Sequence, residues 1–465
     1  MSYKKLIGLF LIGIFLLAGC SIPFAPTEMP TPSALPPATA TATAAASATP
    51  EPTQAPTGTL PPVITATPPP TQAPTQAVIA VTPVPGQIVH FPGGSDVTVT
   101  QIRMVSGTDG WAVGENLKLD PNNQHVLRTS DGGVTWRDVT PPQKGGTSAT
   151  EGGPGTQAQA FFLNSNKAWV GFTPQPGDTG AENRLLWFTT DGGQSWKTSA
   201  PLAVDPNAEY FAPGPITFLA DGKSGWLVVH AGAGMNHDYI YIYGTRDSGA
   251  TWSMLVDPMD VNQGSIMGCY KSGLGFVDAE HGWLAGSCNG VAAGVLLFKT
   301  QDGGKTWSAV KLTAPSEAPT IYTAQDVSCG SFPPVFFSAQ DGLMEVACSQ
   351  FDQAKPARTW LYFTSDGGAN WKPRLAPASK GSYQFLRAAQ GWFVGDNHVF
   401  STQDGGKTWA TLDKVDWDAQ LSFVDAKTGW VVATAGSAPN IAYALVASID
   451  GGAKWALIKP KIADR

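Results

Sequence analysis

The octapeptide Thr129-Ser130-Asp131-Gly132-Gly133-Val134-Thr135-Trp136 matters most in this chain because it recurs. Its pattern is Ser/Thr-x-Asp-x-Gly-x-Thr/Ser-Trp, and copies spaced at roughly 40–50 residues are typical of propeller blades or solenoids. Seven copies share the central aspartate, at spacings of 60, 56, 55, 64, 38 and 46 residues: Asp131, Asp191, Asp247, Asp302, Asp366, Asp404 and Asp450. Each copy ends on a tryptophan, and we expect these rings to be buried between sheets: Trp136, Trp196, Trp252, Trp307, Trp371, Trp409 and Trp455.

The chemistry of the octapeptide predicts a turn. An aspartate side chain accepts hydrogen bonds from nearby backbone N–H groups, and glycine supplies positive φ. Apolar residues on both sides, such as Leu127 and Val139, indicate a hairpin around it. A catalytic or metal-binding role would need carboxylates that converge, whereas these occur once per repeat. We therefore expect all seven aspartates to be structural, with no bound metal and no cofactor.

Residues 1–19 read as a signal peptide. Lys4 and Lys5 precede an apolar run that is too short to span a membrane comfortably. The following Leu17-Ala18-Gly19-Cys20 resembles the lipobox of bacterial lipoproteins. This resemblance implies cleavage before Cys20 and lipidation of its thiol; the alternative is an ordinary secretory signal with a chance cysteine. We expect an extracytoplasmic protein that a lipid holds to the cell membrane or cell surface.

Residues 20–87 are rich in proline, threonine and alanine, and Glu28 and Glu51 are their only charged residues. Such a segment cannot bury a core and is expected to be disordered and extended. At about 3 Å per residue it would allow the next domain to lie up to roughly 200 Å from the anchor.

Residues 88–465 show a repeated order of predicted strands. A strand with an aromatic residue precedes a polar turn and a Gly-Trp strand, a third strand leads into the octapeptide, and its tryptophan opens a fourth. Examples of the Gly-Trp strand begin at Gly110, Gly225, Gly282, Gly391 and Gly429. Four strands in each of seven units predict an all-β protein, a seven-bladed β-propeller of four-stranded antiparallel blades. A solenoid would need capping repeats, and the sequence contains none.

Two family resemblances follow from these residues. The octapeptide resembles the Asp-box, or bacterial neuraminidase repeat. Its combination with F-x-D-x-x-x-G-W-x-V-G is similar to the photosystem II assembly factor family of seven-bladed propellers, over nearly all of residues 95–458. In that family an arginine-rich patch is implicated in holding a membrane-protein client. This chain has no comparable arginine cluster.

Four cysteines lie in the predicted propeller, in pairs 19 residues apart: Cys269 with Cys288, and Cys329 with Cys348. Each pair brackets the first two strands of one unit, and an antiparallel hairpin places those ends opposite each other. We predict two disulfides within successive blades, as suits an exported protein. Zinc is the alternative, but there is no C-x-x-C and no histidine at ligand spacing.

Catalytic motifs are sparse. A sialidase site needs three arginines, and the first normally lies in an Arg-Ile-Pro motif, whereas Arg103 is followed by Met104-Val105. Arg128 and Arg246 lie beside octapeptides, on the wrong face for a shared site. Xyloglucanases of this repeat class use two propellers, and one is predicted here. An extracellular glycosidase of sialidase type remains the alternative function.

The face opposite the Asp-boxes carries the longer loops and is the expected binding face. Its most polar stretch runs from residue 229 to 239 and contains His230, His237 and Asp238. His237-Asp238 could act as an acid–base pair, although we favour a solvated, glycine-rich loop. Residues 88–465 carry the whole net charge of −7, since the two lysines and two glutamates before residue 88 cancel, which disfavours nucleic acid. We expect a monomeric protein- or glycan-binding module, in one form an assembly or stability factor for membrane proteins.

Overall fold

The protein was examined as a computed structural model. It describes residues 86–464 except for short internal stretches: 147–154, 175–179, 206–207, 209, 235–236, 261, 263–265, 289–293, 325, 351–356 and 438–439. The predicted signal peptide, Cys20 and the predicted linker up to residue 85 lie outside the described residues. The unit from Ile79 to Arg465 is treated by itself below.

The described chain is all-β. Its strands form successive antiparallel sets, and the one helix among the described residues is a single 3-10 turn, η1 (Ala181–Asn183). No helix in this part of the chain has the length and apolarity needed to cross a bilayer.

Each of the first three sets contains four strands in chain order. The first comprises β1 (Thr98–Met104), β2 (Gly110–Asn116), β3 (Asp120–Thr129) and β4 (Thr135–Asp138). The second comprises β5 (Gln157–Phe162), β6 (Ala168–Thr173), β7 (Leu186–Thr189) and β8 (Lys197–Thr198). The third comprises β9 (Ala212–Phe218), β10 (Gly225–Gly234), β11 (His237–Thr245) and β12 (Ser253–Val256).

The later sets repeat this order. The fourth comprises β13 (Tyr270–Phe276), β14 (Gly282–Ser287), β15 (Leu296–Thr300) and β16 (Ser308–Ala309). The fifth, in which two short strands share the first place, comprises β17 (Val327–Ser331), β18 (Val335–Phe336), β19 (Gly342–Gln350), β20 (Arg358–Thr364) and β21 (Lys372–Leu375). The sixth comprises β22 (Ser382–Arg387), β23 (Gln390–Gly395), β24 (His398–Thr402) and β25 (Ala410–Lys414). The last comprises β26 (Asp418–Phe423), β27 (Gly429–Ser437), β28 (Asn440–Ser448) and β29 (Ala456–Ile458).

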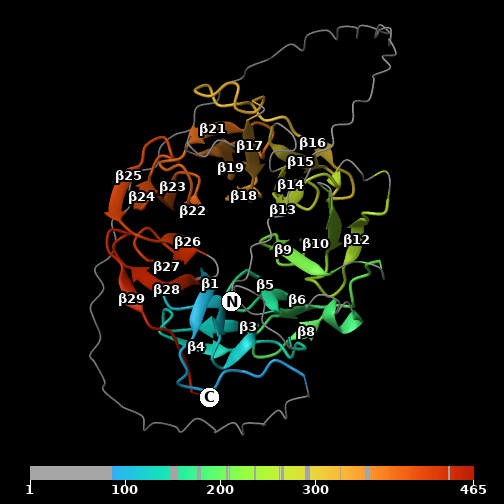
Figure 1. Ribbon diagram of the computed structural model, residues 1–465, viewed down its shortest axis with the longest axis vertical. Coiled ribbons are helices and arrows are strands. Elements are labelled where there is room, and N and C mark those ends of the chain that lie inside the picture. The colour runs from blue at the N-terminus through green and yellow to red at the C-terminus, as the bar shows by residue number, and fades with distance from the viewer. Residues whose placement is uncertain are drawn as a thin grey trace, which may run out of the picture. The chain divides into compact units, whose positions relative to one another are not determined.

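The sets are arranged around a common centre, with their first strands innermost and their fourth strands outermost (Figure 1). A single pairing of Ser287 with Gly330 links β14 to β17, so the fourth and fifth sets form one nine-stranded sheet. Apolar clusters fill the contacts between successive sets, and we call each such contact a seam. One cluster joins Trp430 and Leu445 of the last set to Ile102 and Met104 of the first, so the end of the described chain packs against its beginning.

The Gly-Trp pattern has a steric reason. The ring of Phe218 lies so close over Gly225 that a Cβ there would meet it at 2.5 Å. The other face of Phe218 stacks on Trp169 of the preceding set, with ring centroids 3.7 Å apart. Phe276 is held in the same way, 3.6 Å from Trp226. Glycine thus leaves room for these two rings between their own sheet and the tryptophan of the set before. In the second set Ala168 takes the place of the glycine, and Phe162 stacks on Trp111 at the longer centroid distance of 5.3 Å.

The tryptophans differ in burial from the sequence-based expectation. Only Trp136 and Trp371 of the Asp-boxes are buried, and the other five are half-buried. The tryptophans of the second strands, which follow glycine or, at Trp169, alanine, are at most 3% exposed: Trp111, Trp169, Trp226, Trp283, Trp392 and Trp430. The box tryptophans are less buried because they lie at the start of the short outer strands.

The first and last described segments both lie at the first set. From the sequence, the segment from Gln87 to Phe91 could either add an extra edge strand or simply lead into the first set. It makes one isolated bridge, Gln87 with Lys144, and so leads in. The added strand comes from the other end of the chain, because β30 (Lys461–Ile462) pairs in parallel with β4. The last set supplies its own four strands, as expected.

Candidate functional site

The octapeptides, which we call Asp-boxes only for the repeat that they resemble, are closed hydrogen-bonded turns between the third and fourth strands. In the first box, Thr135 donates its N–H and its hydroxyl to Asp131, at 3.0 and 2.6 Å. Thr129 donates its hydroxyl to Asp131 at 2.9 Å and accepts the N–H of Gly133 at 3.0 Å. Both oxygens of the carboxylate are used inside the turn. The face of the domain that carries these turns is called the Asp-box face.

Departures from the consensus are accommodated differently in two boxes. Asn370 takes the threonine slot of the fifth box, and its side-chain amide donates to Asp366 at 2.8 Å. In the seventh box, Lys454 donates only its backbone N–H to Asp450, at 3.0 Å. The seventh turn therefore lacks one side-chain hydrogen bond that the other boxes have.

The boxes also hold neighbouring sets together, which sequence reasoning missed. The indole N–H of Trp226 donates to the carbonyl of Gly303, the residue after the aspartate of the next box, at 2.8 Å. Three more tryptophans at this place in their second strands make the same bond across their seams: Trp169 to Ser248, Trp392 to Gly451 and Trp430 to Gly132. We call this bond the tryptophan latch. In the sequence, the only signal for this bond was the recurrence of Gly-Trp at a constant place in the repeats.

We expect Asp302→Ala to lower the free energy of unfolding by about 0.5–1.5 kcal/mol, because the turn loses bonds to Thr300 and Thr306. Asp450→Ala should cost less, since its box makes fewer bonds. Thermal melts of all seven alanine variants, read beside ligand binding, test this. A box aspartate whose variant loses binding at normal stability would contradict a purely structural role.

Both predicted disulfides are present, Cys269–Cys288 and Cys329–Cys348. Cys329 and Cys348 lie directly opposite each other on β17 and β19, while Cys269 and Cys288 close the ends of β13 and β14. Cys329 and Cys348 are buried, whereas the Cys269–Cys288 bridge is half-buried. The two bridges stiffen the joined fourth and fifth sets.

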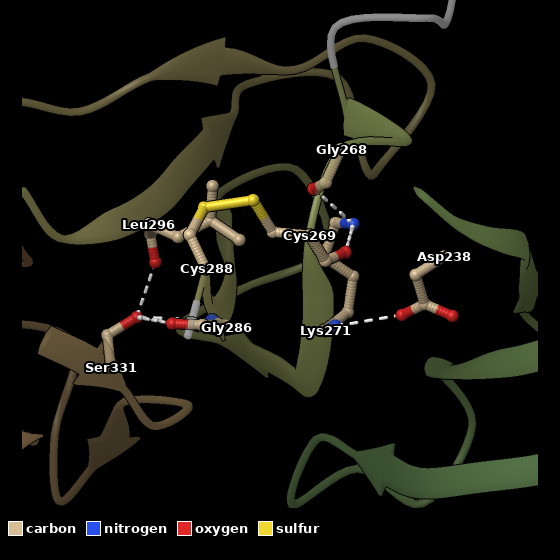
Figure 2. The surroundings of a disulfide bond; sticks show 8 residues. All are labelled: Asp238, Gly268, Cys269, Lys271, Gly286, Cys288, Leu296 and Ser331. Carbon is tan, nitrogen blue, oxygen red and sulfur yellow. Dashed lines mark hydrogen bonds between the residues drawn. A yellow bond between two sulfur atoms is a disulfide. The ribbon is translucent and has the colours of Figure 1, made fainter. Parts of the chain in front are cut away.

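Figure 2 shows a charged corner beside the first bridge, where the buried carboxylate of Asp238 faces β13. Its Oδ2 accepts the backbone N–H of Lys271 at 2.9 Å, and its Oδ1 lies 2.8 Å from Nδ1 of His230. The Lys271 ammonium is fully buried and donates to the carbonyls of Gly268 and Cys269, at 2.9 and 2.5 Å. We call His230, Asp238, Lys271 and Tyr270 the corner cluster.

The expected loop from residue 229 to 239 is wrong. β10 and β11 extend through most of it, and a hairpin with residues 235–236 outside the description connects them. His230 and Asp238 are 9% and 4% exposed rather than solvated. The expected partner of Asp238 also changes: His230 takes that place, and His237 lies on the other side of the strand, stacked with Tyr239. Alternation of Asp238, Ile240 and Ile242 was the overlooked strand signal.

Burial lowers the pKa of Lys271 to about 8, against the charge of Asp238, which raises it. Tyr270 is 55% exposed and stacks on His230, with ring centroids 5.3 Å apart. Tyr239 is 38% exposed at the start of β11, which the pairing of His237 with Gly268 holds beside β13. The corner cluster therefore presents aromatic surface on a rigid, charged base.

A second buried charged group, also missed from the sequence, lies in the first set. His125 is fully buried between Asp138, at 2.7 Å, and Asp120, at 3.3 Å. Burial alone would lower the pKa of His125, but the two carboxylates raise it to about 9. Burial raises the pKa of Asp138, and the hydrogen bond and charge of His125 outweigh this and lower it to about 2. Asp138 also accepts the N–H of Phe91, whose ring stacks on His125 at 3.7 Å.

The arginines that we considered for a sialidase-type carboxylate clamp make structural contacts instead. Arg128 pairs with Asp109 at 2.8 Å and lies 5.3 Å from the ring of Trp111. Arg246 lies 4.7 Å from the ring of Trp226. The described residues contain no group of three or more histidine, cysteine or acidic side chains that could hold a metal ion.

No protein-family model matches the chain. Over 170 residues it is 27% identical to the photosystem II assembly lipoprotein Ycf48 of Prochlorococcus marinus, covering 31% of this chain and 45% of that one. It is similar to Ycf48. Over 237 residues it is 24% identical to a xyloglucanase of a Paenibacillus species, covering 46% of this chain and 22% of the enzyme. The chain thus spans less than half the length of these curated relatives.

A solved structure described as YCF48 bound to D1 peptide covers 78% of this chain and 95% of its own, with a TM-score of 0.43 and 19% identity.

Proposed function

We propose that this chain is a lipid-anchored, extracytoplasmic propeller that binds a segment of a partner protein and serves in the assembly or stability of membrane proteins. The observation that carries the proposal is the corner cluster, where the exposed ring of Tyr270 stands on a buried His230–Asp238 pair. Exposed aromatic rings on a rigid base are typical anchors of protein interfaces. The similarity to an assembly lipoprotein favours the same role.

The proposed domain is a closed ring of seven blades. Support comes from the successive strand sets, from an apolar cluster at each seam and from the packing of the last set on the first. The parallel pairing of β30 with β4 adds a second connection at that seam.

The binding face we propose is the one opposite the Asp-boxes, where β11 and β13 begin. Tyr270 and Tyr239 lie there, and the Cys269–Cys288 bridge fixes the adjoining strand ends. A preorganised surface loses little conformational entropy when it binds.

Capture of partners from native membranes with the full chain tests this function. Tyr270→Ser should weaken capture by about tenfold or more at an unchanged melting temperature, because the ring is exposed but its base is not. Leu457→Ser, at an equally exposed residue on β29, is the matched control and should leave capture unchanged. Equal capture by both variants would refute the corner cluster as the site.

Anchoring at Cys20 is the second part of the proposal. Cys20→Ala should release the protein from membranes or leave its signal uncleaved, since no acylated thiol can form. Fractionation with an immunoblot for size reads out both effects. Normal processing together with full membrane retention would exclude a lipid anchor at this residue.

A glycoside hydrolase is the second candidate, favoured by the likeness to a xyloglucanase and by the His230–Asp238 pair. Assays of the full chain on xyloglucan and on sialosides distinguish it from a binding module. Turnover that His230→Ala abolishes would make the protein an enzyme.

A further inference from the structure

The seam between the fifth and sixth sets lacks the tryptophan latch. Its Gly-Trp position holds Leu343, which follows Gly342 on β19. The carbonyl that a tryptophan would meet belongs to Gly405, the residue after Asp404. Nη1 of Arg374 donates to that carbonyl instead. An arginine from β21 therefore does here what an indole does at four other seams.

A hollow of about 770 Å³ lies at this seam on the Asp-box face. Phe363 and Arg374 of the fifth set line one side, and Ala388, Ala389 and Lys407 of the sixth set line the other. Hollows of several hundred Å³ are the size that holds small ligands.

The Arg374 guanidinium is held in place. It lies 4.3 Å from the ring centre of Phe363, and its Nη1 is bonded to Gly405. Burial lowers the pKa of Arg374, and the charge of Asp404 opposes this. Because a guanidinium has five donors, bonding through Nη1 leaves others for a bound group.

The lining carries three carboxylates, those of Asp341, Asp366 and Asp404, and three cationic side chains, those of Lys372, Arg374 and Lys407. The Asp404 carboxylate is used inside its own turn, by the N–H groups of Lys407 and Thr408 and by two hydroxyls. Trp371 lines the hollow with its ring at 9% exposure, while its indole nitrogen is buried away from solvent. The side chains of Lys372 and Lys407 add positive charge to the rim.

We propose that this hollow binds an acidic sugar, whose carboxylate pairs with Arg374. Bidentate pairing with a carboxylate is the strongest interaction open to a fixed guanidinium. A sugar ring also carries hydroxyls that need both donors and acceptors, and the lining offers lysines beside the carboxylate of Asp341. This site lies on the face opposite the corner cluster and is independent of it.

Calorimetry of the full chain with trigalacturonate tests the site. We expect measurable binding that Arg374→Gln weakens by about tenfold or more, whereas the matched variant Arg246→Gln, at a latched seam, leaves it unchanged. Leu343→Trp should also weaken binding, because an indole at that position would compete with Arg374 for the carbonyl of Gly405. Melting temperatures check that each variant is folded.

Neutral maltotriose and an acidic hexapeptide provide the contrasting probes. Binding of maltotriose as tight as that of trigalacturonate would overturn the role of the carboxylate. Arg374-dependent binding of the peptide alone would overturn the assignment to a sugar. No heat from trigalacturonate, or equal heat with wild type and Arg374→Gln, would refute the site. None of these results depends on Tyr270 or on partner capture.

Discussion

Replacing His125 by leucine is expected to lower the free energy of unfolding by about 3–5 kcal/mol. The reason is that Asp138, at 2.7 Å, would lose its cation and stay buried, and Asp120 would lose a second contact. The docking of Phe91, which stacks on His125, would weaken with it. Urea unfolding at pH 6 measures the change.

His281→Leu is the matched control for this variant. His281 also contacts a carboxylate, Asp278 at 2.9 Å, but both side chains are exposed. Its loss should change stability by less than about 0.5 kcal/mol. Equal effects of the two histidine variants would show that burial of the His125 group contributes nothing.

The same group predicts a pH dependence. The pKa of His125 is raised to about 9, so its contribution is complete below its unfolded value of about 6.5 and disappears as pH rises through about 9. The pKa of Asp138 is lowered to about 2, so its contribution is complete above about 4 and disappears as pH falls through about 2. His125→Leu should therefore cost most between about pH 4 and 6.5.

Glu345→Val is expected to raise the free energy of unfolding by about 3 kcal/mol at pH 8 and to change this free energy far less at pH 4.5. Glu345 is 8% exposed and lies opposite Leu361, on the same face of β19 as Leu343. Burial raises its pKa to about 7, and its charge raises the pKa of Tyr383, the titratable side chain facing it from the sixth set. Other sets carry an apolar residue here, such as Val228.

The sign follows from proton linkage. Between about pH 4.5 and 7 the folded chain holds a proton that the unfolded chain has lost, so stability falls as pH rises and the full cost is present above about 7. A shift of this size corresponds to about 3 kcal/mol. Glu280→Val, at an exposed site, is the control and should show no such difference. An equal effect of Glu345→Val at pH 4.5 and 8 would contradict the raised pKa.

Much of the architecture could be predicted because its signals are local. The seven boxes predict turns from residues at most four apart, and the structure contains those turns, with Asp131 bonded to Thr129 and Thr135. The 19-residue spacing predicts the disulfides, since both cysteines of a pair lie in one hairpin. Strand order within each set follows from the same short range.

The candidate sites could not be predicted because they depend on distant pairs. His230 and Asp238 approach each other only when β10 and β11 extend as a long hairpin, and Lys271 joins them from the next set. His125 meets Asp138 across a turn whose own residues gave no hint of a buried charge.

Repetition along the chain was therefore enough to predict the turns, the order of the strands and the cysteine pairing. A hairpin brings together residues that are near in sequence, so each of these features has a local signal. The side-chain contacts across the seams were determined only by the packing of the sheets in the tertiary structure. Trp430 donates to Gly132, which is 298 residues away, and Arg374 stands in for an indole that Leu343 lacks. Such contacts depend on which side chains of two separately formed sheets meet, and no period in the sequence records that choice.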